Sequence, residues 1–182
     1  MHHFLIGLPG SGKSTFAAQL DSLNDESIII SPDRIRAELY GNESIQGNWQ
    51  EIEAVLISRI QEALNARQTV IYDATNAQRT WRLKFLKKVA VATEEPLQWM
   101  AWYLKAPIKI CKVWNQQRSR KVPTEVIESM AQALSEFPPH IAEGFAKVVE
   151  VDLSKNSLSL ADLKREIDGV CYSSGSRNSS TY

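Results

Sequence analysis

The sequence predicts a three-layer α/β fold, in which helices cover both faces of a five-stranded parallel sheet. Two observations lead to this prediction. Five short apolar runs alternate along the chain with segments that carry apolar residues at helical spacing. The first run is followed at once by the glycine-rich pattern Gly7–Ser14 and then by a helical segment. Alternating strands and helices favour a parallel sheet with right-handed crossovers.

The first half of the chain contains the clearest element signals. Residues 1–6 and 27–30 are expected to be buried strands, and residues 15–20 the first turns of a helix. Ser31 is expected to cap the next helix, about 32–39, with Pro32 at its first position. Apolar residues at three- and four-residue spacing then predict a long helix that begins near Trp49 and ends at about Ala66.

The second half continues the alternation. Residues 68–73 are expected to be a strand ending in Asp73, and Asn76 is expected to cap a helix carrying Phe85 and Val89 inward. An aromatic-rich strand is expected at 97–104, and Thr124 is expected to cap a later helix. The remaining elements are a helix at 107–118, a strand at 147–151 and a helix at 160–167.

Length and composition indicate one domain, 1–170, followed by a Ser-rich tail, 171–182, that we expect to be disordered. Apolar runs are too short to span a membrane, and the N-terminal residues are used as a strand, not as a signal peptide. Cys111 and Cys171 form no metal or disulfide pattern and indicate ordinary thiols. A cytoplasmic protein is therefore expected.

Basic residues are concentrated in one part of a chain whose net charge is zero. Eleven of the twenty-one Lys and Arg residues lie between 74 and 124, together with only two acids, Glu94 and Glu95. Such a surplus suits a phosphate-rich ligand. The alternative is that these side chains form the solvated faces of amphipathic helices.

The pattern Gly7–Ser14 is the strongest functional signal, because it fits G-x-x-x-x-G-K-[ST] between a strand and a helix. Its glycines allow the backbone N–H groups to turn towards a polyphosphate at a helix N-terminus. Lys13 is expected to reach the β- and γ-phosphates and the Ser14 hydroxyl to bind Mg²⁺. The residues expected to hold the donor in this loop are Gly10, Ser11, Gly12, Lys13, Ser14 and Thr15.

Polar residues after later strands could complete a phosphate-transfer site. Asp33 could orient an attacking hydroxyl, and Arg36, one helical turn on, could bind an anionic group of the acceptor. Asp73 could hold Mg²⁺ with Ser14, and Arg118 and Arg120 could close over the nucleotide from a lid region at about 115–135.

Each of these assignments has a structural alternative. Asp33 could merely complement the helix dipole, with Arg36 as a solvated partner, and Asp73 could form a turn. The Arg118–Arg120 segment could be a solvated interhelical loop. The tryptophans are expected to belong mostly to the core; Trp49 could instead stack on a base. The other four tryptophans are Trp81, Trp99, Trp102 and Trp114.

Four segments together resemble the kinase module of polynucleotide 5′-hydroxyl kinases, found in phage and bacterial RNA-repair proteins. They are the glycine-rich loop, Ser31–Gly41, Asp73–Asn76 and Arg118–Ile127, and the resemblance covers about residues 3–135. It implies a P-loop NTPase fold of adenylate-kinase type with a helical lid. It also implies ATP as the donor, Asp33 as general base, Arg36 on the acceptor's phosphate and Arg118 on the donor phosphates.

The resulting hypothesis is an ATP- and Mg²⁺-dependent kinase that phosphorylates a hydroxyl, foremost the 5′-OH end of RNA or DNA. Two alternatives remain open at this point. One is a small-molecule kinase of the gluconate or shikimate type. The other is a nucleotide-binding ATPase switch that works through partners, although a basic lid that shields the γ-phosphate from water suits transfer better.

Overall fold

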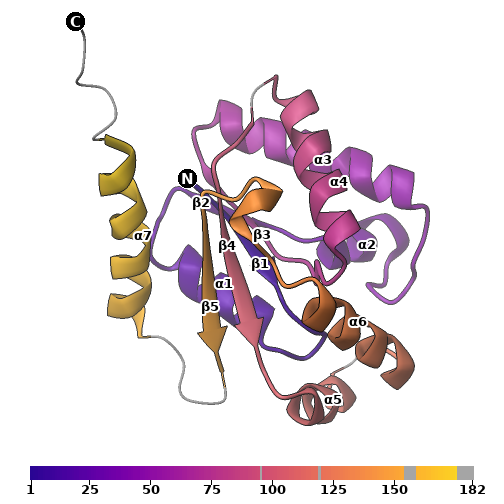
Figure 1. Cartoon of the computed structure of the whole chain (residues 1–182). Coiled ribbons are helices and arrows are strands. Elements are labelled where there is room, and N and C mark those ends of the chain that lie inside the picture. Colours follow the sequence, from indigo (N-terminus) through magenta and orange to yellow (C-terminus); the bar gives the residue numbers. More distant parts are fainter. Residues whose placement is uncertain (95, 119, 154–158, 176–182) are drawn as a thin grey trace, which may run out of the picture.

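A five-stranded parallel sheet lies at the centre of the molecule, in the strand order β2-β3-β1-β4-β5 (Figure 1). The computed structural model describes residues 1–94, 96–118, 120–153 and 159–175. Every expected strand is present within two residues of its predicted ends, so the predicted fold class is confirmed. The strands are β1 (His2–Ile6), β2 (Ser27–Ile30), β3 (Thr69–Tyr72), β4 (Trp99–Lys105) and β5 (Lys147–Asp152).

Helices cover both faces of this sheet, with α1 and α7 on one side and the other helices on the opposite side or at its lower edge (Figure 1). Strands covered on both faces are apolar almost throughout, which explains why they are continuous runs in the sequence. The helices are α1 (Lys13–Asp21), α2 (Pro32–Tyr40), α3 (Trp49–Asn65), α4 (Arg79–Ala92), α5 (Ile108–Gln116), α6 (Thr124–Glu136), the 3₁₀ turn η1 (Ile141–Glu143) and α7 (Leu160–Gly175).

The strand side chains alternate between two cores. Leu5 and Trp102 pack with Phe16 of α1 and Leu163 of α7. The opposite face carries a cluster of aromatic rings in which Tyr72 and Phe85 stack with centroids 4.1 Å apart. Phe4, Trp99 and Phe145 complete this cluster. The two cores fix the sheet, and thereby the loops that leave its carboxyl edge.

Two of these loops are joined directly by hydrogen bonds. The N–H of Gly7 donates to the carbonyl of Thr75 (3.0 Å), so the loop after β1 is fastened to the loop after β3. The Asn76 side-chain Nδ2 donates to the Leu5 carbonyl (2.7 Å) in β1. The phosphate loop and the segment containing Asp73 therefore form one rigid edge.

The expected helix caps are partly wrong. Asn76 does not cap α4, which begins at Arg79 after Gln78; Asn76 has a positive φ of 50° and its amide is used on β1 instead. Thr124 is the first residue of α6 rather than its cap, since Pro123 takes that position. Ser31 does occupy the cap position of α2, but its side chain makes no capping hydrogen bond.

The tryptophan prediction is also partly wrong. Trp99 and Trp102 are buried as expected, but Trp49, Trp81 and Trp114 are between 42% and 49% exposed. Each exposed ring lies on a helix, where apolar spacing alone does not say how far the inward face extends.

The C-terminal helix α7 continues beyond the expected end at 167 and includes residues 171–175 of the expected tail. Residues 176–182 of that tail lie outside the described part of the chain. None of the described helices combines the length and apolar character needed to cross a bilayer.

Candidate active site

The phosphate loop turns sharply between β1 and α1 and packs directly against α5. Gly10 and Gly12 have positive φ angles of 77° and 84°, which L side chains rarely adopt. A Cβ atom on Gly10 would also lie 2.4 Å from the carbonyl oxygen of Cys111. Glycine is therefore required at position 10 by both backbone conformation and the close approach of α5.

The first turn of α1 presents the features of an anion site. Gly12 caps the helix without any side-chain hydrogen bond, and the first turn contains no acidic residue. Ser14 and Thr15 are exposed there. The N–H groups of a first helical turn have no intrahelical acceptor, so they can serve a phosphate. The N–H of Ser11, in contrast, already donates to the Leu8 carbonyl (3.0 Å).

Lys13 is buried beneath this loop, and its Nζ donates to the carbonyls of Gly7 (3.0 Å) and Leu8 (2.7 Å). Burial lowers the pKa of Lys13 from 10.5 to about 8; the nearby Asp73 and Asp33 carboxylates oppose this shift and Arg118 adds to it. Three of the other predicted site residues therefore act electrostatically on Lys13. The structure brings the predicted residues together around one buried cation.

Asp33, the second residue of α2, lies between two guanidinium groups. The Nη1 atom of Arg36 donates a hydrogen bond to Asp33 Oδ1 at 2.5 Å, and Arg120 Nη1 forms an ion pair with the same oxygen, also at 2.5 Å. The Arg36 and Arg120 side chains are 11% and 16% exposed, while the Asp33 side chain is 36% exposed. A carboxylate accessible from one side is thus held by two largely buried cations. Arg120, which we expected beside the donor phosphates, contacts the carboxylate of the predicted general base.

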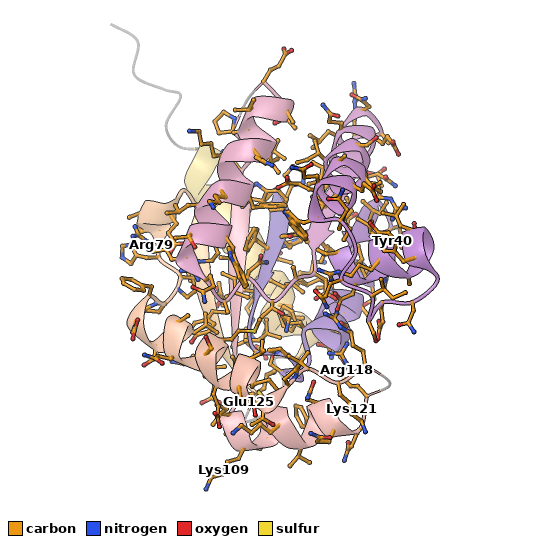
Figure 2. All side chains as sticks on the ribbon, turned by 90° about the vertical axis from the view of Figure 1, so that its right-hand side faces the viewer. Tyr40, Arg79, Lys109, Arg118, Lys121 and Glu125 are labelled. Carbon is orange, nitrogen blue, oxygen red and sulfur yellow. The ribbon has the colours of Figure 1, made fainter. Side chains whose placement is uncertain are left out.

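The loop between α5 and α6 that carries Arg118 and Arg120 is held in place by Asn115. This buried side chain donates from Nδ2 to the Val122 carbonyl (2.8 Å) and accepts from the Val122 N–H at Oδ1 (3.0 Å). Arg118 itself is exposed. Figure 2 shows Arg118 and Lys121 on the same side of the molecule as Tyr40, away from Arg79. The sequence contained no signal for Asn115, which is one of several polar residues in an amphipathic helix.

Asp73 follows β3 and is buried, and its N–H donates to the Ile30 carbonyl (2.9 Å) of β2. Its carboxylate has no hydrogen-bond partner among the described residues. With the exposed hydroxyl of Ser14, it offers the oxygen ligands that Mg²⁺ prefers. These two residues would supply oxygen ligands to a magnesium ion bound at this edge of the sheet.

A buried ion pair that sequence reasoning missed supports this edge from behind. Arg82 is fully buried and bonds both oxygens of Glu143 (2.6 and 2.7 Å). It also donates to the carbonyls of Asn76 (3.2 Å), Ala77 (3.0 Å) and Phe137 (2.9 Å). Arg82 therefore joins the loop after β3 to the end of α6. A basic residue in an amphipathic helix normally faces solvent, so no local signal marked it.

The expected basic surplus of residues 74–124 is largely neutralised by acids from outside that segment. Six of its eleven basic residues form ion pairs with such acids, in the pairs Arg79–Glu143, Arg82–Glu143, Lys88–Glu53, Lys105–Glu150, Lys112–Glu128 and Arg120–Asp33. The basic residues that are concentrated in this segment of the sequence therefore do not form a single basic face in the folded protein.

Two buried side-chain polar atoms lack a hydrogen-bond partner in the described part of the chain, and both belong to this site. They are Ser11 Oγ in the phosphate loop and Arg36 Nε beside Asp33. Buried polar groups in native proteins are nearly always bonded, and exceptions commonly mark ligand sites. One of these atoms lies in the loop expected to bind the donor phosphates, and the other lies beside Asp33.

Comparison with known proteins places the chain among P-loop kinases. A family model described as an AAA domain matches residues 3–137. L-seryl-tRNA(Sec) kinase of Methanococcus maripaludis is 33% identical over 131 residues, which is 69% of this chain and 49% of that protein. The chain thus spans about half the length of this curated relative.

Solved structures show the same fold. A chain in the Pnkp1/Rnl/Hen1 RNA repair complex is 25% identical with a TM-score of 0.61, covering 75% of this chain and 45% of that chain. Shikimate kinase from Acinetobacter baumannii is 18% identical with a TM-score of 0.57, covering 97% and 95%. The second likeness concerns the fold alone.

Proposed function

We propose that this chain, which belongs to the AAA-domain family of P-loop kinases, transfers the γ-phosphate of ATP to the 5′-hydroxyl end of RNA or DNA. The main support is the arrangement at the sheet edge. The carboxylate of Asp33, held by Arg36 and Arg120, lies within electrostatic range of Lys13 in the phosphate loop. A donor half and an acceptor half therefore adjoin.

The relatives point to RNA as the acceptor class. The curated relative at 33% identity is by name a kinase of a seryl-tRNA, and the structural relative at 25% identity belongs to an RNA repair complex. These names, together with the resemblance of the motifs, favour a nucleic-acid end over a free metabolite.

In the donor half, the N–H groups at the start of α1 bind the phosphates, and Lys13 leaves the carbonyls of Gly7 and Leu8 to reach them. Arg118, exposed and near Lys13, neutralises charge on the transferring group. Ser14 and Asp73 would hold Mg²⁺, which would supply further neutralisation of the phosphate oxygens. Burial of Lys13 and Asp73 excludes water from this side.

In the acceptor half, Asp33 accepts the proton of the attacking hydroxyl. The hydroxyl oxygen then forms a bond to the γ-phosphorus while the bond to the bridging β,γ-oxygen breaks, and that electron pair leaves with ADP. The carboxylate orients the nucleophile in line with the leaving group, and Arg36 holds an anionic group of the acceptor.

The test is transfer of labelled phosphate from ATP to oligonucleotides that carry a 5′-hydroxyl. We expect Asp33→Asn to lower transfer about 10²- to 10⁴-fold, the range of a lost general base, with ATP affinity nearly unchanged. Asp25→Asn, which alters an exposed carboxylate, is the matched control and should retain full transfer. Undiminished transfer by Asp33→Asn removes this residue from the mechanism, and no transfer to any oligonucleotide refutes the acceptor class.

A second acceptor is favoured by one specific observation, the 33% identity with L-seryl-tRNA(Sec) kinase. In that case the acceptor hydroxyl would belong to a seryl group on tRNA, not to the 5′ end of a nucleic-acid strand. An assay of phosphate transfer to four acceptors separates these possibilities. The acceptors are seryl-tRNA, 5′-hydroxyl RNA, gluconate and shikimate. ATP hydrolysis that no acceptor stimulates would instead indicate an ATPase switch.

A further inference from the structure

Arg36 and Arg120 come from different parts of the fold but converge on one oxygen atom. Arg36 belongs to α2, one helical turn after Asp33, whereas Arg120 comes from the loop between α5 and α6. Both Nη1 atoms contact Asp33 Oδ1 at 2.5 Å. The lid region therefore contributes a cation to the acceptor half, not only to the donor half.

The charges and donors of this cluster are not balanced by Asp33 alone. Two guanidinium groups face one carboxylate, which leaves one positive charge. Each guanidinium has five N–H donors, and Asp33 uses one Nη1 of each. Arg36 Nε is buried and has no hydrogen-bond partner among the described residues. The cluster can thus accept one further anion with several oxygen atoms, and a phosphate has this chemistry.

The position of Arg120 is defined by the fold rather than by a free loop. The two hydrogen bonds between Asn115 and the backbone of Val122 close the loop on either side of it. The Arg120 side chain is 16% exposed, whereas Arg118 is exposed. Arg118 acts on Lys13, and Arg120 contacts Asp33. The two arginines of this loop therefore serve different halves of the site.

We propose that Arg120 is an acceptor-positioning residue, which adds a second guanidinium to Arg36, the residue that the resemblance assigns to the acceptor's phosphate, and so forms a two-guanidinium clamp for a phosphate next to the acceptor hydroxyl. This rests on the proposed kinase function. Asp33 holds both guanidiniums in place, and the acceptor's phosphate takes their remaining N–H groups. A nucleoside 3′-phosphate, whose phosphate lies near the 5′-hydroxyl, fits this clamp better than an uncharged nucleoside or sugar.

Binding measured by titration calorimetry tests the clamp without requiring transfer. A nucleoside 3′-monophosphate should bind the unmodified protein at least about tenfold more tightly than the nucleoside, as expected for charge-assisted bonds to phosphate. Arg120→Ala should remove most of this difference and leave ATP affinity within about twofold. Lys121→Ala, the neighbouring exposed cation, is the matched control and should change neither.

Two further variants protect the test against misfolding and against a purely structural role. Arg120→Lys keeps the charge but loses the planar fork, so it should give an intermediate loss. Asp33→Asn keeps a hydrogen-bond acceptor beside both guanidiniums but removes the negative charge that repels a bound phosphate, so it should strengthen binding of the 3′-monophosphate.

Three results have distinct meanings. Equal binding of nucleoside and 3′-monophosphate overturns the clamp, and so does a loss of ATP affinity in Arg120→Ala with acceptor binding unchanged, since Arg120 would then be a donor residue. Selective 3′-monophosphate binding without transfer to any oligonucleotide supports the clamp and refutes the proposed function.

Discussion

Raising the pH above 8 is expected to weaken ATP binding, because it removes the proton from Lys13. Burial beneath the phosphate loop lowers the pKa of Lys13 to about 8, so the ammonium form prevails below that pH and is lost above it. The polyphosphate binds the ammonium form, so binding above this pKa requires Lys13 to take up a proton from the solvent.

The size of the effect follows from this pKa. If only the protonated form binds, the apparent Kd is multiplied by 1 + 10^(pH − pKa), which is about 1.1 at pH 7 and about 11 at pH 9. Affinity should therefore fall about tenfold between these values. With an ordinary lysine pKa of 10.5, the same change would be only a few per cent.

The assay is the Kd of MgATP measured by calorimetry from pH 6.5 to 9.5, for the unmodified protein and for Lys13→Arg. A guanidinium remains protonated throughout this range, so the variant should show no alkaline decline. The ratio of the two affinities at each pH cancels the titration of ATP itself.

Two outcomes contradict the reasoning. If the affinity of the unmodified protein for MgATP stays constant up to pH 9.5, Lys13 keeps an ordinary pKa. A decline of equal size in Lys13→Arg would assign the titration to another group.

Two more predictions concern stability, both measured by urea unfolding. Arg82→Ala should lower the free energy of unfolding by about 3–5 kcal/mol, because buried Glu143 keeps only its longer contact with Arg79 (3.8 Å); a loss below about 1 kcal/mol contradicts this. His3 is buried with a pKa lowered to about 4, and its Nδ1 accepts from Trp102 Nε1 (3.1 Å). The unfolded chain takes up this proton near pH 6.5, so His3 alone should lower stability by about 2 kcal/mol between pH 7 and 4.5. His3→Gln should reduce that slope, and an identical slope in the variant counts against His3.

Most elements of the fold could be predicted from local patterns. The strands are apolar on both faces, and Pro32 and the glycine-rich loop mark the starts of α2 and α1. Caps were predicted less well, since Asn76 and Thr124 are good capping residues that the structure uses otherwise. The Asn76 amide is used on β1 because the two loops must pack together at the sheet edge.

The candidate site was predicted in part, since Lys13, Asp33 and Asp73 do meet at the carboxyl ends of parallel strands. The partners of the arginines could not be predicted. Arg82 looks like any surface cation of an amphipathic helix, but its partner Glu143 is 61 residues away. Arg120 lies two residues from Arg118, yet the carboxylate that it contacts belongs to Asp33 on α2.

The sequence by itself determined that this chain forms a parallel sheet with a phosphate loop, because strand burial, glycine conformations and helix starts depend on near neighbours. Only the tertiary structure decided which charges meet: Arg120 with Asp33, Arg82 with Glu143, and buried Lys13 with Asp73, Asp33 and Arg118. The physical reason is that ion pairing and desolvation depend on distance in space, and the chain packing that sets those distances joins segments far apart in sequence.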